Sequence, residues 1–194
     1  CGIYHLDKVP KAYNFSRFMG LLMKYLDEVE QLIPQLAERM TEEIPDFGNR
    51  LAMDSKFIDS RAKRRSGRTS PDRRSESDAD WGKKTYQGVH RDGKAWKKEV
   101  SCFGFKVHLV TDSTYELPVD FILSRASESD VAYGHKVVDK LQAKHRKIVD
   151  RCEYMTADKA YDDGKLISRL MQEEINIRPV IDKRRLWKDE PERE

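Results

Sequence analysis

The stretch YMTADKAYDD, residues 154–163, ends a strand-like run with the carboxylate of Asp158, just before a helical pattern begins. Far upstream, the stretch LAMDSK, residues 51–56, places Asp54 in a similar short apolar run. A sheet can bring strands that are distant in sequence side by side. Two strand-borne carboxylates separated by about half of the chain therefore suggest one metal site that the fold assembles.

The apolar patterns around these two stretches predict an α/β domain. Alternating apolar residues over 98–111 and apolar residues over 117–123 predict two strands joined by a turn at 112–116. Helical spacing over 131–141 and 162–174 alternates with short strand-like runs at 152–157 and 177–181. A hairpin followed by strand, helix, strand, helix and strand predicts a mixed sheet with helices packed on it.

The N-terminal part of the chain has a different pattern. Apolar residues recur at steps of three and four across residues 16–44, which predicts an amphipathic packing helix or helix pair. Pro34 lies inside this pattern and should kink the helix or restart it as a first-turn proline. We expect a helical segment over 1–48, the α/β domain over 49–186 and a charged tail over 187–194.

Residues 60–98 are polar and basic, and we expect them to form a long loop inserted after the first strand. Seven residues from Arg61 to Ser75 are basic and only Asp72 is acidic. Such a block is typical of a solvated segment or of a phosphate-binding one, and both readings stay open.

Three aromatic residues, Trp81, Tyr86 and Trp96, interleave with lysines in the same region. They are interpreted either as anchors of the loop or as platforms on which unpaired bases stack.

Composition excludes several classes of protein. The chain has 194 residues, which fits one domain. It has no apolar run near the roughly 18 residues that span a bilayer. Its three cysteines are scattered, which argues against a disulfide framework or zinc ribbon and fits a reducing cytoplasm. No Walker loop and no GxSxG motif is present.

Cys1 at the start and the charged end suggest a piece of a longer protein.

Three segments, in this order and spacing, resemble the catalytic domain of DDE transposases encoded by bacterial insertion sequences. They are AMDSK at 52–56, FGFKVHLVTD at 103–112 and TADKAYD at 156–162. Leu117-Pro118 and Ser129-Asp130 follow the second segment as they do in that family. The resemblance covers about residues 10–186, and it implies a ribonuclease H-like mixed sheet flanked by helices.

The resemblance also implies a mechanism and its metal. Asp54 and Asp158 would be catalytic carboxylates that bind Mg²⁺, for which Mn²⁺ substitutes, since Mg²⁺ prefers hard oxygen ligands. Two such ions can serve both ends of an in-line displacement at a phosphodiester. The implied activity is DNA strand cleavage and strand transfer at insertion-sequence ends.

The implied partner is double-stranded DNA at transposon ends, paired in a homodimer in the bacterial cytoplasm, at the nucleoid, with no membrane involved. We expect phosphate contacts from basic residues. The candidates are Arg61, Lys63, Arg64, Arg65, Lys83, Lys84 and Lys159.

The family's third carboxylate has no counterpart here. The resemblance implies a Glu on a helix after the last strand, but Glu190, Glu192 and Glu194 lie in no helical frame and are not assigned. We therefore expect a truncated transposase with an incomplete triad, which leaves open whether the chain is an enzyme. A catalytically inactive DNA-binding remnant and a structure-specific nuclease on the same fold remain as alternatives.

Other polar residues are expected to have structural roles. Asp112 begins the turn between two strands, and a structural role in that turn and a role as a metal ligand both stay open. Asp130 should cap the following helix, and Asp162 or Asp163 the helix after the last carboxylate. His108 is expected at the surface or at a rim, because it alternates with Val107 and Leu109.

Overall fold

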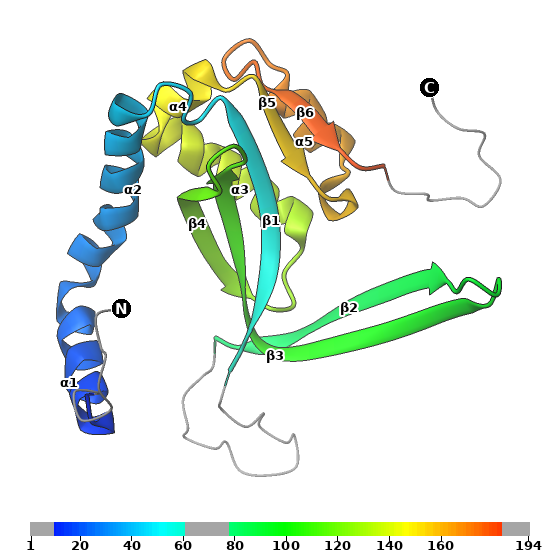
Figure 1. Cartoon of the computed structure of the whole chain (residues 1–194), viewed down its shortest axis with the longest axis horizontal. Helices are drawn as coiled ribbons and strands as arrows, with labels where there is room; N and C mark the ends of the chain where they lie inside the picture. The colour runs from blue at the N-terminus through cyan, green and yellow to red at the C-terminus, as the bar shows by residue number, and fades with distance from the viewer. Residues whose placement is uncertain (1–9, 61–77, 184–194) are drawn as a thin grey trace.

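In the computed structural model, residues 10–60 and 78–183 are described, and they form one six-stranded mixed sheet with helices (Figure 1). Along the sheet the strands follow the order β2-β3-β1-β5-β6, and β4 pairs with β3 on its other side. The strands are β1 (Arg50–Asp59), β2 (Asp80–Val89), β3 (Ala95–Asp112), β4 (Leu117–Arg125), β5 (Tyr154–Ala157) and β6 (Arg178–Ile181).

The strand directions confirm the predicted α/β class. Strands β1, β3 and β4 pair in antiparallel fashion, whereas β1 pairs with β5, and β5 with β6, in parallel. Parallel pairs need crossover connections, and helices provide them here. This is the mixed sheet expected of a ribonuclease H-like fold.

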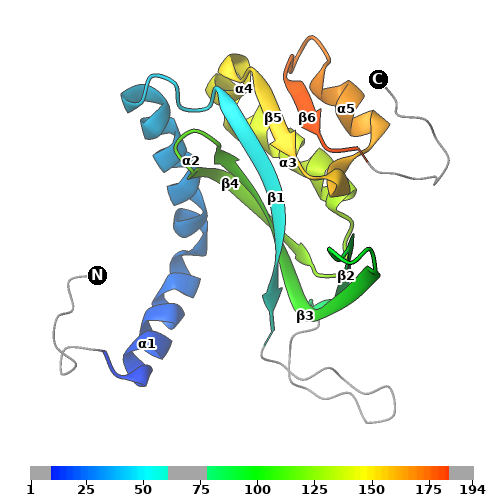
Figure 2. The same cartoon turned by 45° about the vertical axis from the view of Figure 1, so that its right-hand side comes forward.

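The main core lies on one face of the sheet. Helices α3 (Asp130–Lys144), α4 (Arg146–Arg151) and α5 (Gly164–Leu170) gather behind the strands (Figure 2). The cluster of buried residues joins Leu51 and Met53 from β1 with side chains of these helices. Because side chains alternate along a strand, Asp54, between Met53 and Ser55, is exposed on the other face.

The N-terminal segment is helical, as expected, but it is interrupted at another place. Helix α1 (Ala12–Leu22) is followed by the 3₁₀ turn η2 (Met23–Tyr25) and helix α2 (Leu26–Glu43). Two outcomes are expected at Pro34, a kink or a restart of the helix. The restart is wrong, because α2 continues through that residue. Proline has no backbone N–H, so α2 lacks the hydrogen bond that another residue would donate at position 34. Its C-terminal half is held by packing of Ala37 and Met40 against the core.

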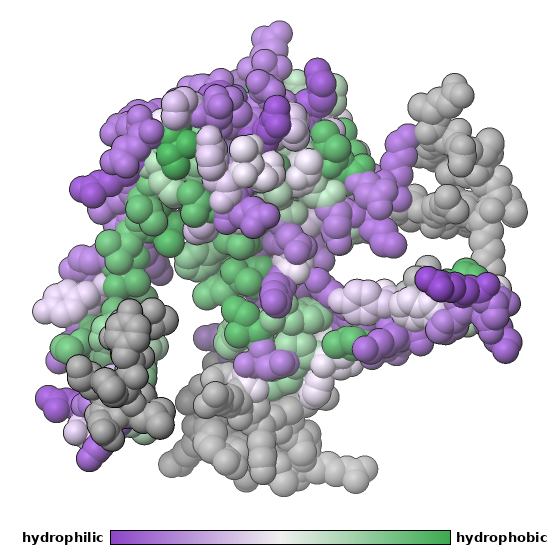
Figure 3. Space-filling model, viewed as in Figure 1, coloured by the Kyte–Doolittle hydropathy of each residue, from purple (hydrophilic) through white to green (hydrophobic). Residues whose placement is uncertain are grey.

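The hydropathy of the visible surface differs between these parts. Figure 3 shows hydrophobic residues gathered over α2 and the neighbouring part of the sheet, whereas the projecting strands β2 and β3 are mostly hydrophilic. No helix among residues 10–60 and 78–183 is long and apolar enough to cross a membrane.

The loop predicted for residues 60–98 is wrong over its second half. Strand β2 and the first part of β3 pair from Asp80 to Gly104 and project from the sheet as a two-stranded ribbon, which we call the arm (residues 80–103; Figure 1). A turn at residues 90–94 closes it, with Gly93 at a φ of 81° and the His90 amide donating to the Lys94 carbonyl at 2.8 Å. The remainder of the predicted insertion, residues 61–77, lies outside the described residues.

The arm was missed because neither of its faces packs on the core over most of its length. Residues 91–101 are all exposed, so the sequence there lacks the apolar alternation that marks a half-buried strand. The inner half of β3 shows that alternation and was predicted. Figure 1 shows how β3 runs from the arm into the sheet, where it pairs with β1 on one side and β4 on the other.

Candidate functional site

Asp54 lies on β1, and Asp158 directly follows the end of the adjacent parallel strand β5. The register pairs Ala52 with Thr156 and Met53 with Ala157, and Asp54 and Asp158 are the residues that come directly after this ladder. Adjacent strands are about 4.8 Å apart. This register is compatible with the shared site that the sequence predicts for the two carboxylates, and that site stays a prediction.

Each carboxylate is oriented by a nearby backbone amide. Asp54 accepts a hydrogen bond at Oδ1 from the Ser55 amide at 2.7 Å. Asp158 accepts at Oδ1 from the Ala160 amide at 2.8 Å, which caps the short 3₁₀ helix η3 (Lys159–Tyr161). Both aspartates are exposed. Local bonds of this kind hold each carboxylate in place while leaving a second oxygen of each to other ligands.

A buried tyrosine lies close to the acidic pair. Tyr161 is fully buried, and its hydroxyl has no hydrogen-bond partner among the described residues. Burial raises the pKa of Tyr161, and the charges of Asp130, Asp54 and Asp158 raise it further, whereas the nearby Ser55 hydroxyl opposes the rise. The three carboxylates are thus close enough to act on one phenol.

Next to this tyrosine lies a polar cluster that sequence reasoning missed. The Lys106 ammonium, which is almost buried, contacts the Asp130 carboxylate at 3.0 Å and donates to the Glu128 carbonyl at 2.7 Å. Asp130 is the first residue of α3, whose N-cap is Ser129, and no side-chain cap bond is formed. The predicted capping role of Asp130 is therefore wrong, because Lys106 holds its carboxylate instead.

His108 belongs to the same cluster, so its predicted surface or rim position is also wrong. It is fully buried, its ring stacks on Tyr133 with centroids 4.6 Å apart, and Nε2 lies 2.9 Å from the Ser124 hydroxyl. Burial lowers the pKa of His108 to about 4; Asp130 opposes this shift, whereas Lys106 adds to it. The even-numbered residues of this part of β3, His108 among them, point to the buried face of the strand, and Val107 and Leu109 point to the other face.

The remaining acidic predictions concern turns and caps, and the geometry confirms them. Asp112 is buried and accepts hydrogen bonds from the amides of Gly48, Thr114 and Tyr115, at 2.7, 2.8 and 2.8 Å. Asp163 caps α5 by accepting from the Leu166 amide at 2.9 Å.

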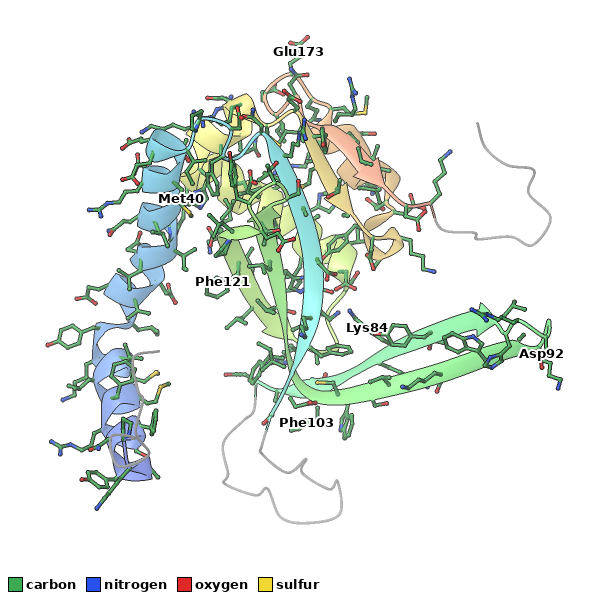
Figure 4. The ribbon with its side chains drawn as sticks, in the orientation of Figure 1. Met40, Lys84, Asp92, Phe103, Phe121 and Glu173 are labelled. Atoms are coloured by element: carbon green, nitrogen blue, oxygen red, sulfur yellow. The ribbon has the colours of Figure 1, made fainter. Side chains whose placement is uncertain are left out.

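A hollow of about 440 Å³ opens beside the Lys106–Asp130 pair. Its lining includes Trp81, Lys83 and Ala160, so the hollow lies between the base of the arm and the segment that follows Asp158. A larger hollow of about 590 Å³ is formed by α3, α5 and residues 171–175. Figure 4 shows Glu173, which lines the larger hollow, at the far end of the molecule from Lys84. The smaller hollow is the one lined by Ala160, two residues after Asp158.

The predicted basic residues are placed in different ways. Lys83 forms an ion pair with Glu99 at 2.5 Å. Lys84 donates from Nζ to the Ser55 carbonyl oxygen at 3.0 Å, directly beside Asp54. Lys159 follows Asp158 and is exposed. The other four basic candidates, Arg61, Lys63, Arg64 and Arg65, lie outside the described residues.

The donor set of the acidic pair suits a hard cation, because Mg²⁺ binds carboxylate oxygens and keeps several of its waters. Within residues 10–60 and 78–183, no group of three or more His, Cys, Asp or Glu side chains is arranged to hold a metal ion. Asp54 and Asp158 stay the ligands that the sequence predicts for such a cation. Glu190, Glu192 and Glu194 lie outside the described residues.

A mixed sheet of this strand order, with helices packed on it, is the sheet of ribonuclease H-like domains. The family model described as "Transposase DDE domain" matches residues 45–190, and the chain belongs to that family. No curated protein sequence matches the chain.

Among solved structures, the cryo-EM structure of a piggyBac transposase synaptic complex with hairpin DNA is similar to this chain at 16% sequence identity and a TM-score of 0.38. The match covers 74% of this chain and 24% of that one, so the chain spans about a quarter of the length of that transposase.

Proposed function

We propose that this chain is the DNA-cleaving and DNA-joining part of a transposase, and that Asp54 and Asp158 hold its divalent metal ions. The proposal rests on membership of the transposase family. The observation that supports it best is the register of β1 and β5, in which Asp54 and Asp158 directly follow the last paired residues, Met53 and Ala157. We place its action at DNA in the bacterial cytoplasm.

Each residue of the site has a defined task in this proposal. The Ser55 and Ala160 amides fix the two carboxylates before any ligand arrives, so that little ordering remains to be done on binding. When bound, Mg²⁺ or Mn²⁺ would supply activation of the attacking oxygen and neutralisation of charge on the phosphodiester. A water and a DNA 3′-hydroxyl can use the same site, since both attack through oxygen.

The substrate we propose is the double-stranded DNA end of an insertion sequence, with two ends held in a homodimer. The Lys84 ammonium bonds to the carbonyl of Ser55, the residue after Asp54, and Lys159 directly follows Asp158. Both lysines are therefore suited to contact the phosphates that flank the cut. Contacts of this kind release counterions, and binding should weaken steeply as salt is raised.

The test of the metal site is a titration of Mg²⁺ or Mn²⁺ into the wild-type chain and into the Asp54→Ala, Asp158→Ala double variant. The double variant should lose the binding isotherm. Asp46→Ala, which removes another exposed aspartate, should keep it. Equal binding by wild type and double variant would refute the assignment of the two ligands.

Substrate class is tested on the protein that the complete reading frame encodes. Cutting of duplex inverted-repeat ends, dependent on metal and on Asp54, supports the transposase. Preferential cutting of branched or RNA–DNA substrates favours a structure-specific nuclease on this fold. Salt-sensitive DNA binding without any metal-dependent cutting favours an inactive DNA-binding remnant.

A further inference from the structure

The arm has two faces of different chemistry, which the strand register separates. In β2 and β3, Lys83 pairs with Ser101 and Lys84 with Val100, and alternate pairs point to opposite sides. One side, which we call the Glu99 face, carries Lys83, Thr85, Val89, Lys97, Glu99 and Ser101. The other, which we call the Trp96 face, carries Lys84, Tyr86, Gly88, Trp96, Lys98 and Val100.

The cations of the Glu99 face are neutralised within the arm. The Glu99 carboxylate contacts Lys83 at 2.5 Å and Lys97 at 3.0 Å. Hydrogen bonds from Lys83 and then Lys97 hold the pKa of Glu99 below its ordinary value. A phosphate approaching this face would have to compete with a carboxylate that already lies between the two ammonium groups.

The Trp96 face is cationic and aromatic instead. Between positions 82 and 102, none of the strand residues that point to this face is acidic. Lys98 forms no ion pair with any residue that the structure describes. Trp96 lies over Gly88, since a Cβ at Gly88 would come within 2.8 Å of the indole nitrogen. The missing side chain at Gly88 therefore lets the indole lie against the ribbon. Trp96 is 38% exposed and Tyr86 is 49% exposed.

The base of this face joins the acidic pair. Lys84 is its innermost cation, and its ammonium bonds to the carbonyl oxygen of Ser55, the residue after Asp54. Figure 4 shows Lys84 on the side of the arm that faces the rest of the domain, whereas Phe103, which shares the other face, projects from the opposite side. A ligand lying along the Trp96 face therefore leads toward Asp54.

We propose that the Trp96 face binds one DNA strand with unpaired bases, which stack on Trp96 and Tyr86 while Lys98 and Lys84 contact its phosphates. This deepens the proposed function and rests on it, because the strand is delivered to the site of cutting. The exposed aromatic rings favour single-stranded over duplex DNA as the ligand, since the faces of paired bases are hidden inside the duplex stack. Stacking on exposed aromatic rings is tolerant of sequence, so the strand is recognised by chemistry rather than by base order.

The stacking is tested with the full chain, a fluorescently labelled oligothymidylate and EDTA in place of any divalent ion. Trp96→Ala should weaken binding by about tenfold, the effect of losing one stacked base. Trp96→Phe should restore most of the affinity, and Val89→Ala, which trims an exposed apolar residue of the opposite face, should leave it unchanged. Circular dichroism confirms that each variant is folded.

The phosphate contacts are tested by a matched pair of adjacent lysines. Lys98→Ala should weaken binding about fivefold at 0.1 M salt and reduce the slope of log affinity against log salt by about 0.7. Lys97→Ala removes the same charge from the Glu99 face and should change neither quantity. Equal effects of the two variants overturn the assignment of the face.

Tighter binding of a matched duplex, together with indifference to Trp96→Ala, overturns the single-strand assignment. The metal-free binding assay is independent of the titration of Asp54 and Asp158. If the titration refutes the metal ligands but the strand still binds selectively to the Trp96 face, only the proposed metal site fails. If the titration supports the metal ligands but strand binding is not selective for the Trp96 face, only the present proposal fails.

Discussion

The Lys106 ammonium lies 3.0 Å from the Asp130 carboxylate, although 24 positions separate the two residues in sequence. Their side chains are only 6% and 14% exposed. The pair ties the middle of β3 to the first turn of α3, immediately beside the acidic site. Ion pairs withdrawn from water are costly to break on one side, because the remaining charge is left buried without compensation.

Removing only the lysine of this pair should destabilise the fold. Lys106→Met is expected to lower the free energy of unfolding by about 3 kcal/mol, and the double variant Lys106→Met, Asp130→Leu should recover part of that loss. Urea denaturation gives both values. Lys83→Met, at an exposed pair, should cost less than about 1 kcal/mol. A cost for Lys106→Met as small as that of Lys83→Met would contradict the burial of the pair.

Stability should fall as the pH is lowered from about 6.5 to about 4, because of His108. Burial lowers the folded-state pKa of His108 to about 4, so in this window the unfolded chain binds a proton that the folded chain does not. The full loss is about 3 kcal/mol, reached below the folded pKa. His108→Gln should flatten this part of the profile, whereas His135→Gln, at a partly exposed position, should not. Urea midpoints measured across the window give the profile.

Gly104 should tolerate no side chain. A Cβ there would lie 2.1 Å from the Ile58 carbonyl oxygen and 2.6 Å from the Ser60 amide nitrogen, both of which are backbone atoms of or next to β1. We expect Gly104→Ala to destabilise the domain by about 3 kcal/mol or more, since backbone must move. Gly20→Ala is the matched control, because no atom lies within 4 Å of its Cβ and alanine favours the helix. Thermal unfolding of both variants gives the comparison. Similar melting temperatures would contradict the close approach of Gly104 to the backbone at Ile58 and Ser60.

Tyr161→Phe should be neutral or stabilising by up to about 1 kcal/mol, because the buried hydroxyl has no hydrogen-bond partner within the described part of the chain. Denaturant unfolding in the absence of divalent ions checks this. A clear loss of stability would mean that the hydroxyl forms a bond in solution. Repeating the measurement with Mg²⁺ then reports whether the phenol contributes to the occupied site.

The sheet was predictable because its strands follow local sequence patterns that the fold preserves. Asp54 and Asp158 each interrupt or follow a short apolar run, and such runs become the adjacent strands β1 and β5. Asp112 and Asp163 serve the nearby amides expected of turn and cap residues. The bonds from Tyr115 and Leu166 each span three positions, so the nearby sequence contains most of the information that decides them.

The polar cluster was not predictable in this way, since its contacts are long-range. Asp130 has the position of a cap, but Lys106 on another strand holds its carboxylate. His108 has an ordinary alternating position, and only the arrival of Ser124 and Tyr133 makes that position a buried one. Lys106 and His108 alternate with the same spacing as Val110. This spacing was the one sequence feature that indicated buried polar groups on this face of β3.

The continuity of β3 sets a length scale for contact with DNA. The arm joins the sheet without a hinge, because at the junction the Ser60 amide donates to the Phe103 carbonyl and the Ala126 amide to the Gly104 carbonyl. From Ala95 to Gly104 an extended strand measures about 30 Å. A bound single strand that follows the arm should thus show a nuclease-protection footprint that extends over about this length from the cut, always on the same side of it.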